Sequence, residues 1–307
     1  MDEGSAPPRR RRELAEGGTR VLRLSELTEV GVGRGVRRAA VQSGRWVALP
    51  RRGVVTDRGP LDQEAGWRAA LIAVGASARL GGISALQVAG LTGYEEPVTH
   101  VWVAKSRSRA RLVPGVRVHE TRRWCAADAE TSGLPRSTPP VAAVQAALWS
   151  RSARQAALCL VMPVQQRIVG TDDLLAQLER VRRHPFRRVL LAVLADVADG
   201  AQSLNELDVA RMCRERGLPE PDRQVPRRGP GGLRYLDVYW SRYRVALEIN
   251  GIGHDALDQS ARDDIRLLDL QLDGDAALTL GVLTLRTDPD PFFARLGSLL
   301  RQRGWTG

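Results

Sequence analysis

Two acidic residues stand within apolar sequence near the C-terminal end of the chain, in a pattern typical of residues that hold a divalent metal ion. Asp237 follows Tyr235 and Leu236, and Glu248 belongs to the run Val-Ala-Leu-Glu-Ile-Asn that ends at Asn250. A carboxylate that is buried without a partner is so unfavourable that it is usually neutralised, paired with a cation or bound to a metal. The two acids therefore predict a site at which something positively charged is bound.

This site is expected on a β-hairpin, with Asp237 on the first strand and Glu248 on the second. Because side chains alternate along a strand, Glu248 and Asn250 share one face, and the neighbouring leucine and isoleucine point into a core. If Asp237 lies on the same face, two carboxylates and an amide converge, with His254 a few residues further on. Oxygen ligands of this kind bind Mg²⁺ or Mn²⁺ in proteins that act on phosphates.

Length and composition indicate a water-soluble chain with two or three domains. The chain has 307 residues, of which 43% are hydrophobic, yet no run approaches the roughly 20 apolar residues of a membrane span. The N-terminus lacks the apolar core of a signal peptide. The three cysteines, Cys125, Cys159 and Cys213, lie far apart, so neither a disulfide framework nor a zinc site is indicated. We therefore expect a cytoplasmic protein with no membrane partner.

The basic residues are unevenly distributed along the chain. The net charge is +11, and Lys105 is the only lysine. Residues 1–60 contain thirteen arginines and seven acids, whereas residues 200–307 contain fifteen arginines and sixteen acids. A local excess of arginine is typical of a surface that contacts nucleic acid. The first part of the chain is therefore expected to bind DNA, and the acids of the last part to form the chemical site.

Residues 20–60 have the element order of a winged helix-turn-helix, after a basic arm at 1–19 that is expected to be disordered. Leu22, Leu24 and Leu27 indicate a short helix with Ser25 near its start and Gly31 at its end. A second helix is predicted at 34–42, and two short strands around the turn Pro-Arg-Arg-Gly. In this motif the second helix enters the major groove and the wing touches the DNA backbone. The residues expected to contact DNA are Arg34, Arg37, Arg38, Gln42, Arg51 and Arg52. The alternative is a small arginine-coated fold without a DNA role.

The sequence from Leu24-Ser-Glu-Leu to Gly44-Arg-Trp-Val, with Arg52-Gly-Val-Val, resembles the winged helix of the AbiEi family. Members of that family are antitoxins of abortive-infection systems that act as DNA-binding repressors. Gly82-Ile-Ser-Ala-Leu and Val116-Arg-Val-His continue the similarity into the mixed α+β region at 61–200. The resemblance implies double-stranded DNA as a partner, and also a cognate toxin or a second copy of the chain.

The middle region is interpreted as a scaffold with, at most, a partner surface. A strand is predicted at 98–104, with helices at 140–161 and 172–183. A lone histidine such as His119 is more often structural than catalytic. The tryptophans Trp102, Trp124 and Trp149 are likewise expected in the core rather than on a ligand platform.

The last segment, 201–307, is expected to be an α/β unit that begins with the helix Ser203-Leu-Asn-Glu206 and ends that helix at Gly217-Leu-Pro. Glu206 fits two interpretations. It completes a capping box with Ser203, or it supplies a third acid to the hairpin. After the hairpin and the His254 loop, the pattern predicts a helix at 257–272, a strand at 278–286 and a terminal helix from Phe292.

The motifs of this segment resemble, in order, a domain related to very-short-patch repair endonucleases of the PD-(D/E)XK superfamily. They are Ser203-x-x-Glu206, Gly217-Leu-Pro-x-Pro221, Gln224, Tyr235-Leu-Asp237, Glu248-x-Asn-Gly251, His254 and an Arg-Asp helix before Leu285-Arg286. The resemblance implies a restriction-endonuclease-like α/β domain, so the whole chain is expected to be α/β in class, or α+β overall. It also implies Mg²⁺ or Mn²⁺ bound by Asp237, Glu248 and Glu206.

The remaining site residues follow from the same resemblance. Asn250 and His254 join the three acids as catalytic candidates, and Gln224, Arg234, Asp264 and Arg266 are supporting residues. Asn250 stands where the superfamily has lysine, and no lysine occurs in this segment. An amide cannot supply the positive charge that stabilises a developing phosphorane.

Three functions are compatible with these features. The favoured one is a metal-dependent DNA endonuclease that holds its substrate through the winged helix, mainly by phosphate contacts. The second is a non-catalytic, antitoxin-type repressor whose nuclease-like domain is degenerate. The third is purely structural, with Asp237 and Glu248 paired to Arg234 or Arg244.

Overall fold

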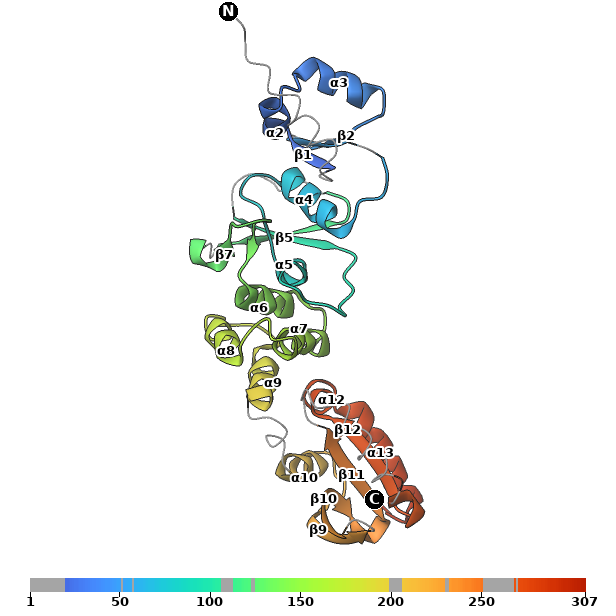
Figure 1. Cartoon of the computed structure of the whole chain (residues 1–307). Helices are drawn as coiled ribbons and strands as arrows, with labels where there is room; N and C mark the ends of the chain where they lie inside the picture. The colour runs from blue at the N-terminus through green and yellow to red at the C-terminus, as the bar shows by residue number, and fades with distance from the viewer. Residues whose placement is uncertain are drawn as a thin grey trace, which may run out of the picture. The chain divides into compact units, whose positions relative to one another are not determined.

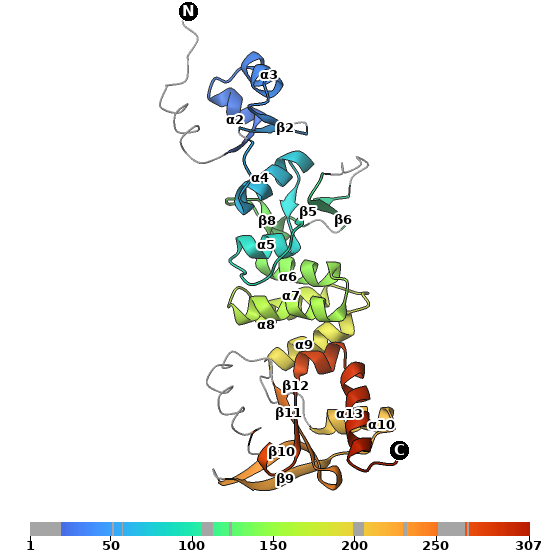
Figure 2. The ribbon, with the colours of Figure 1, turned by 90° about the vertical axis from the view of Figure 1, so that its right-hand side faces the viewer.

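The computed structural model of the chain is a mixed α+β fold, which confirms the expected fold class (Figures 1 and 2). It divides into two compact units, Met1–Ala146 and Ala147–Gly307. The structure describes residues 20–50, 52–56, 58–105, 113–122, 125–198, 206–229, 232–250, 268 and 270–307, without the side chains at 206–207, 223–229 and 232–237. The arm at 1–19 lies outside this range, and the boundaries expected at 60 and 200 stay predictions.

A small sheet with two helices opens the first unit. Its elements are β1 (Val21–Arg23), α2 (Leu24–Glu29), α3 (Arg34–Gln42), β2 (Val47–Leu49) and β3 (Gly53–Val55). The strands are antiparallel in the order β1-β3-β2, so the helix pair is followed by a two-stranded wing. The predicted interval of α3 is confirmed. The first helix starts near Ser25 and ends before Gly31, as predicted. Leu22, one of the leucines that indicated this helix, instead lies in β1 and pairs with Val54.

The wing packs closely on α4 (Gln63–Val74), which begins where the Asp62 carboxylate accepts a hydrogen bond from the Ala65 amide (2.8 Å). A Cβ atom on Gly53 would lie 2.5 Å from Ile72 Cγ2 and 2.8 Å from the Leu22 carbonyl oxygen, so only glycine fits this position. Arg68 of α4 donates to Glu26 Oε1 of α2 (2.5 Å) and to the Val21 carbonyl oxygen (2.8 Å). These contacts attach the helix pair and its sheet to α4.

The rest of the first unit is a five-stranded mixed sheet with helices. It contains β4 (Arg79–Leu80), α5 (Gly82–Val88), β5 (Thr99–Ala104), β6 (Val116–Thr121), η1 (Ala126–Asp128), β7 (Ala129–Glu130) and β8 (Arg136–Ser137), with the strand order β6-β5-β4-β8-β7. The strand predicted at 98–104 is confirmed by β5. Trp102 is buried in this unit, as expected of a core residue, and Trp124 lies outside the described residues.

The second unit begins within α6 (Pro139–Trp149) and continues with three helices, α7 (Ala153–Gln165), α8 (Thr171–Glu179) and α9 (Arg187–Ala198). The prediction of one continuous helix at 140–161 is wrong, because residues 150–152 are not helical and separate α6 from α7. Ser152 caps the new helix there, its hydroxyl oxygen accepting a hydrogen bond from the Gln155 amide (3.2 Å). The helix predicted at 172–183 ends earlier, at Glu179.

A four-stranded sheet forms the rest of the second unit. Its elements are α10 (Glu206–Glu215), β9 (Asp222–Gly229), β10 (Gly232–Trp240), η3 (Ser241–Tyr243), β11 (Val245–Asn250), β12 (Ala276–Gly281), α12 (Val282–Thr287) and α13 (Asp290–Gln302). The strand order is β12-β11-β10-β9, with β9, β10 and β11 antiparallel and β12 parallel to β11. Residues of α10, α12 and α13 pack against one face of this sheet, around Trp240, Leu247 and Phe293.

The predicted strand at 278–286 is only half correct. The strand β12 ends at Gly281, and α12 follows from Val282, with Val282 and Leu285 buried one helical turn apart. The terminal helix predicted from Phe292 is present as α13 and begins at Asp290. The turn into α12 brings Arg286 to face other helices of the second unit.

Arg286 forms a two-point ion pair with a buried acid of α9. Its Nε and one terminal nitrogen donate to the two carboxylate oxygens of Asp196 at 2.9 and 3.0 Å, and the same terminal nitrogen lies 3.5 Å from Asp208 Oδ2 of α10. Asp196 is only 3% exposed. Because α9 and α10 meet α12 through this arginine, the pair joins the helices at 153–198 to the sheet domain of the same unit.

We expect Arg286→Ala to lower the free energy of unfolding of the second unit by about 3 kcal/mol, since it removes the guanidinium that makes two hydrogen bonds to a buried carboxylate. The control is Arg295→Ala on α13, where an exposed arginine donates to the Pro291 carbonyl oxygen (3.1 Å), and its effect should stay within about 0.5 kcal/mol. Urea unfolding followed by circular dichroism measures both. Equal stabilities of the two variants would contradict the role given to the pair.

Candidate functional site

The two predicted acids lie directly beyond the last residue pair between β10 and β11. Val238 pairs with Leu247, Tyr239 with Ala246 and Trp240 with Val245. Extended by one residue, this register sets Asp237 directly opposite Glu248. Facing residues of an antiparallel pair lie on the same face of the sheet, with Cβ atoms about 5 Å apart.

The same row continues across the sheet on both sides. In the β9–β10 ladder, Leu236 pairs with Val225 and Val238 with Arg223, so the position between them sets Asp237 beside Gln224. On the other side, Glu248 pairs with Thr279 of the parallel strand β12. We call Gln224, Asp237, Glu248 and Thr279 the acid row. Thr279 is not predictable from the sequence, because no local signal reveals which residue of β12 lies beside Glu248.

The acid row belongs to the sheet face that α10 and α13 do not cover. Ala246 and Ala277, which alternate with residues of the opposite face, pack there with Tyr239 and Leu270. Glu248 is half-buried, and Asn250 at the end of β11 is exposed. The row is thus near the C-terminal end of β11, where the apolar cover gives way to solvent.

Several predicted residues have no described side chain. Glu206 is the first residue of α10, and Gln224, Arg234 and Asp237 belong to β9 and β10 with only their backbone described. Arg234 and Asp237 are three residues apart on β10, so strand alternation assigns them to opposite faces of the sheet. The residues His254, Asp264 and Arg266, and most of the helix predicted at 257–272, lie outside the described residues; positions 268 and 270–272 are helical.

The donor set of the acid row fits a hard divalent cation. Two carboxylates, an amide and a hydroxyl offer oxygen atoms only, which Mg²⁺ and Mn²⁺ prefer. Within the described part of the chain, no three His, Cys, Asp or Glu side chains gather in a metal-binding arrangement. The side chain of Asp237 lies outside this part of the chain, so Mg²⁺ or Mn²⁺ at the acid row stays a prediction.

Arg244 is engaged elsewhere, which removes one form of the structural interpretation. Its guanidinium donates to Asp275 Oδ1 (2.9 Å) and to the Asp273 carbonyl oxygen. Asp275 is 3% exposed and also accepts from the Tyr239 hydroxyl (3.1 Å). Hydrogen bonding to Asp275 raises the pKa of Arg244. Arg244 therefore neutralises Asp275, at the start of β12, rather than Glu248.

The predicted DNA-contacting residues divide into exposed and structural ones. Arg34, Arg38 and Gln42 are exposed on α3, and Arg52 is exposed at the wing. Arg37 instead turns back to α2, where it donates to the Leu24 carbonyl oxygen (3.2 Å) and the Thr28 hydroxyl (3.0 Å). Arg51 lies outside the described residues. The exposed arginines are thus presented by a helix that Arg37 holds in place.

His119 has a partner that the sequence did not reveal. His100 Nδ1 lies 3.0 Å from His119 Nε2, the two rings are stacked, and His100 Nε2 lies 3.6 Å from the Glu96 carboxylate. Burial and the neighbouring His100 lower the pKa of His119 to about 3, and burial lowers the pKa of His100. The parallel pairing of β5 with β6 creates this contact between residues 19 positions apart.

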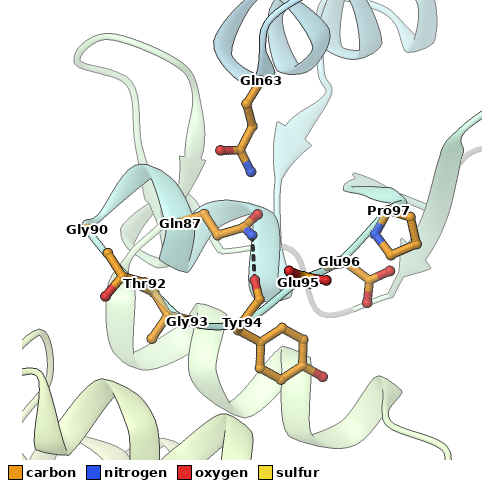
Figure 3. Close-up of a pocket in the computed structure, with 10 residues that line it drawn as sticks. Gln63, Gln87, Gly90, Thr92, Gly93, Tyr94, Glu95, Glu96 and Pro97 are labelled. Carbon is orange, nitrogen blue, oxygen red and sulfur yellow. Dashed lines mark hydrogen bonds between the residues drawn. The ribbon is translucent and has the colours of Figure 1, made fainter.

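A pocket of about 800 Å³ lies in the first unit between the start of α4, the end of α5 and the loop at 90–97 (Figure 3). Gln63 and Gln87 point into it, and Gln87 Nε2 donates to the Tyr94 carbonyl oxygen (3.0 Å). Glu95 and Glu96 form its acidic side. None of the residues predicted for metal or DNA binding lines this pocket.

No protein-family model matches the chain, and no curated protein matches it. Across the described residues, no helix has the length and apolar character needed to cross a bilayer.

We expect acid to destabilise the first unit through the histidine pair. An unfolded histidine takes up a proton near pH 6.5, whereas folded His119 does so only near pH 3. Stability should therefore be complete above pH 6.5 and fall as the pH drops from 6.5 towards 3. Thermal unfolding midpoints between pH 7.5 and 4.5 should fall less in His119→Gln than in the wild type. Parallel pH profiles for the two proteins would contradict this assignment.

Proposed function

We propose that the chain is a DNA-binding protein whose C-terminal sheet domain is a metal-dependent endonuclease acting on phosphodiester bonds. The observation that supports this proposal is the register of β10 and β11, which, continued by one residue, sets Asp237 opposite Glu248, two residues from the exposed Asn250. If the two carboxylates had only a structural role, this arrangement would be unfavourable, because like charges on facing positions of a hairpin repel one another. A bound divalent cation makes that arrangement favourable.

Each residue has a defined role under this proposal. Asp237 and Glu248 hold Mg²⁺ or Mn²⁺, with Glu206 as the third acid. The bound ion supplies positive charge at the phosphate and lowers the pKa of a water molecule. Asn250 orients polar groups at the open end of β11, and His254 is the candidate that moves a proton to or from the reacting oxygen. Gln224, next to Asp237 in the row, helps to orient that carboxylate.

The substrate class is double-stranded DNA, held by the winged helix. Arg34, Arg38 and Gln42 are exposed polar residues spaced four positions apart along α3. Gly35 and Ala39 are also exposed, and they are small enough for the helix to approach a groove closely. Arg52, at the wing, adds a contact to the DNA backbone. Duplex DNA and metal chemistry together favour a cytoplasmic enzyme.

A second candidate function is a repressor of antitoxin type that binds DNA without cleaving it. Two observations favour it: Asn250 occupies the position at which the related nucleases carry lysine, and Lys105, the sole lysine of the chain, belongs to the first unit. A cognate toxin or a second copy of the chain is then the expected partner. This function needs the exposed residues of α3 but not the acid row.

Supercoiled plasmid incubated with Mg²⁺ or Mn²⁺ separates the two functions. The nuclease proposal predicts metal-dependent nicking that falls at least about 100-fold in Asp237→Ala/Glu248→Ala, because the site contributes several kcal/mol to the reaction. The control, Glu215→Gln/Asp290→Asn, removes two exposed acids of α10 and α13 and should cleave like the wild type. Nicking that is equal in the wild type and the double alanine variant would exclude the acid row as the catalytic site.

Arg37 and Arg38 provide a paired test of the DNA-binding helix. Arg38→Ala should weaken binding to many duplex sequences and reduce the salt dependence of log K by about 1, without changing stability. Arg37→Ala should also lower the unfolding free energy by about 1 kcal/mol, since it loses two hydrogen bonds to α2. Fluorescence anisotropy and urea unfolding measure these effects. Unchanged DNA affinity in Arg38→Ala would count against α3 as the contact surface.

A further inference from the structure

The turn between α8 and α9 concentrates positive charge in the unit that carries the acid row. Residues 180–188 read Arg-Val-Arg-Arg-His-Pro-Phe-Arg-Arg and contain five arginines and no acid. The turn follows the end of α8 at Glu179, and α9 begins at Arg187 (Figures 1 and 2). This turn belongs to the region that the sequence predicts to be a scaffold with, at most, a partner surface.

The turn is held in one conformation by side chains that face inward. His184 Nε2 lies 3.1 Å from the Leu148 carbonyl oxygen, and His184 Nδ1 accepts from the Phe186 amide (3.2 Å). Because Nδ1 is an acceptor, Nε2 carries the hydrogen and donates it to Leu148. The ring of Phe186 meets His184 edge to face, with centroids 5.2 Å apart. Arg187 Nε donates to the Val181 carbonyl oxygen (2.7 Å) and closes the turn.

Three further arginines of the turn face solvent. Arg182, Arg183 and Arg188 are exposed, and no carboxylate of the described residues lies within 4 Å of them. Two exposed arginines of α10 in the same unit are paired with acids. Arg211 pairs with Glu215 and Arg214 with Glu220. The charge of the turn is therefore available to an external anion.

We propose that the turn at 180–188 is a second DNA-backbone contact surface, separate from the winged helix, which binds the phosphates of duplex DNA through Arg182, Arg183 and Arg188. Guanidinium groups suit phosphate oxygens, and a fixed turn presents them with little loss of side-chain and backbone freedom. Duplex DNA is the favoured partner because this unit also carries the acid row, so the inference rests on the proposed function. Phosphate contacts at this turn would hold DNA on the same unit as the acid row, without recognising any particular base sequence.

The test is the salt dependence of binding to a random-sequence 30-base-pair duplex by the full chain. Arg182→Ala/Arg183→Ala/Arg188→Ala should reduce the slope of log K against log salt by about 3, at about 0.9 per phosphate contact. The charge-matched control is Arg295→Ala/Arg301→Ala/Arg303→Ala, which removes three exposed arginines of α13 and its C-terminal end. The control should keep the wild-type slope, and both proteins should keep the wild-type circular dichroism spectrum.

A third variant tests the frame of the turn without changing its arginines. His184→Ala removes both hydrogen bonds of the imidazole, so we expect weaker DNA binding with the wild-type salt slope. If the turn variant keeps the wild-type slope, or loses no more than the control, the inference is overturned while the proposed function stands. If the wild type binds no duplex at all, both are overturned. Loss of binding to anionic phospholipid vesicles, with DNA binding unchanged, would assign the turn to a membrane surface instead and overturn the inference.

Discussion

The antiparallel pairing of β10 with β11 is the constraint on which the proposed site depends. The side-chain period of a strand is two, so a slip of one residue would move Glu248 to the face that carries Leu247 and the packed core. Burial of Val238, Val245 and Leu247 on that face fixes the register, because a shift would expose them and bury charge. The parallel strand β12 adds a second constraint by pairing Leu278 with Leu247. The same packing that stabilises the core therefore sets the two acids opposite each other.

Local signals predicted much of the fold but few of its long-range contacts. The helix at 34–42 was predictable because Gly33 precedes it and Ser43-Gly44 ends it, with Gly44 at a positive φ of 70°. Leu22 could not be placed from the sequence, since an isolated leucine fits either a helix or a strand until its pairing with Val54 is known. In the same way, Val282 and Leu285 fit an apolar strand by residue type, and only the structure shows that a helix begins after Gly281.

The candidate site shows the same division. The alternation of Glu248 and Asn250 follows from strand geometry, so it could be predicted from the residues alone. The neighbour of Glu248 on β12, the partner of His119 on β5 and the acid that binds Arg286 could not, because each is chosen by strand or helix pairing across 19 to 90 residues. The helical position of Arg37 predicts a DNA contact, and the structure adds two hydrogen bonds from its side chain to α2. These bonds and its lower exposure distinguish it from Arg38, and neither follows from the sequence.

The central claim is that the acid row binds a divalent cation, and direct titration with Mn²⁺ tests it without requiring turnover. Electron paramagnetic resonance of free Mn²⁺ measures binding by the full chain, by Asp237→Asn/Glu248→Gln and by the control Glu215→Gln/Asp290→Asn. The account predicts one saturable site in the wild type and the control, weakened at least about tenfold in the acid-row variant. Equal binding by all three proteins would contradict it.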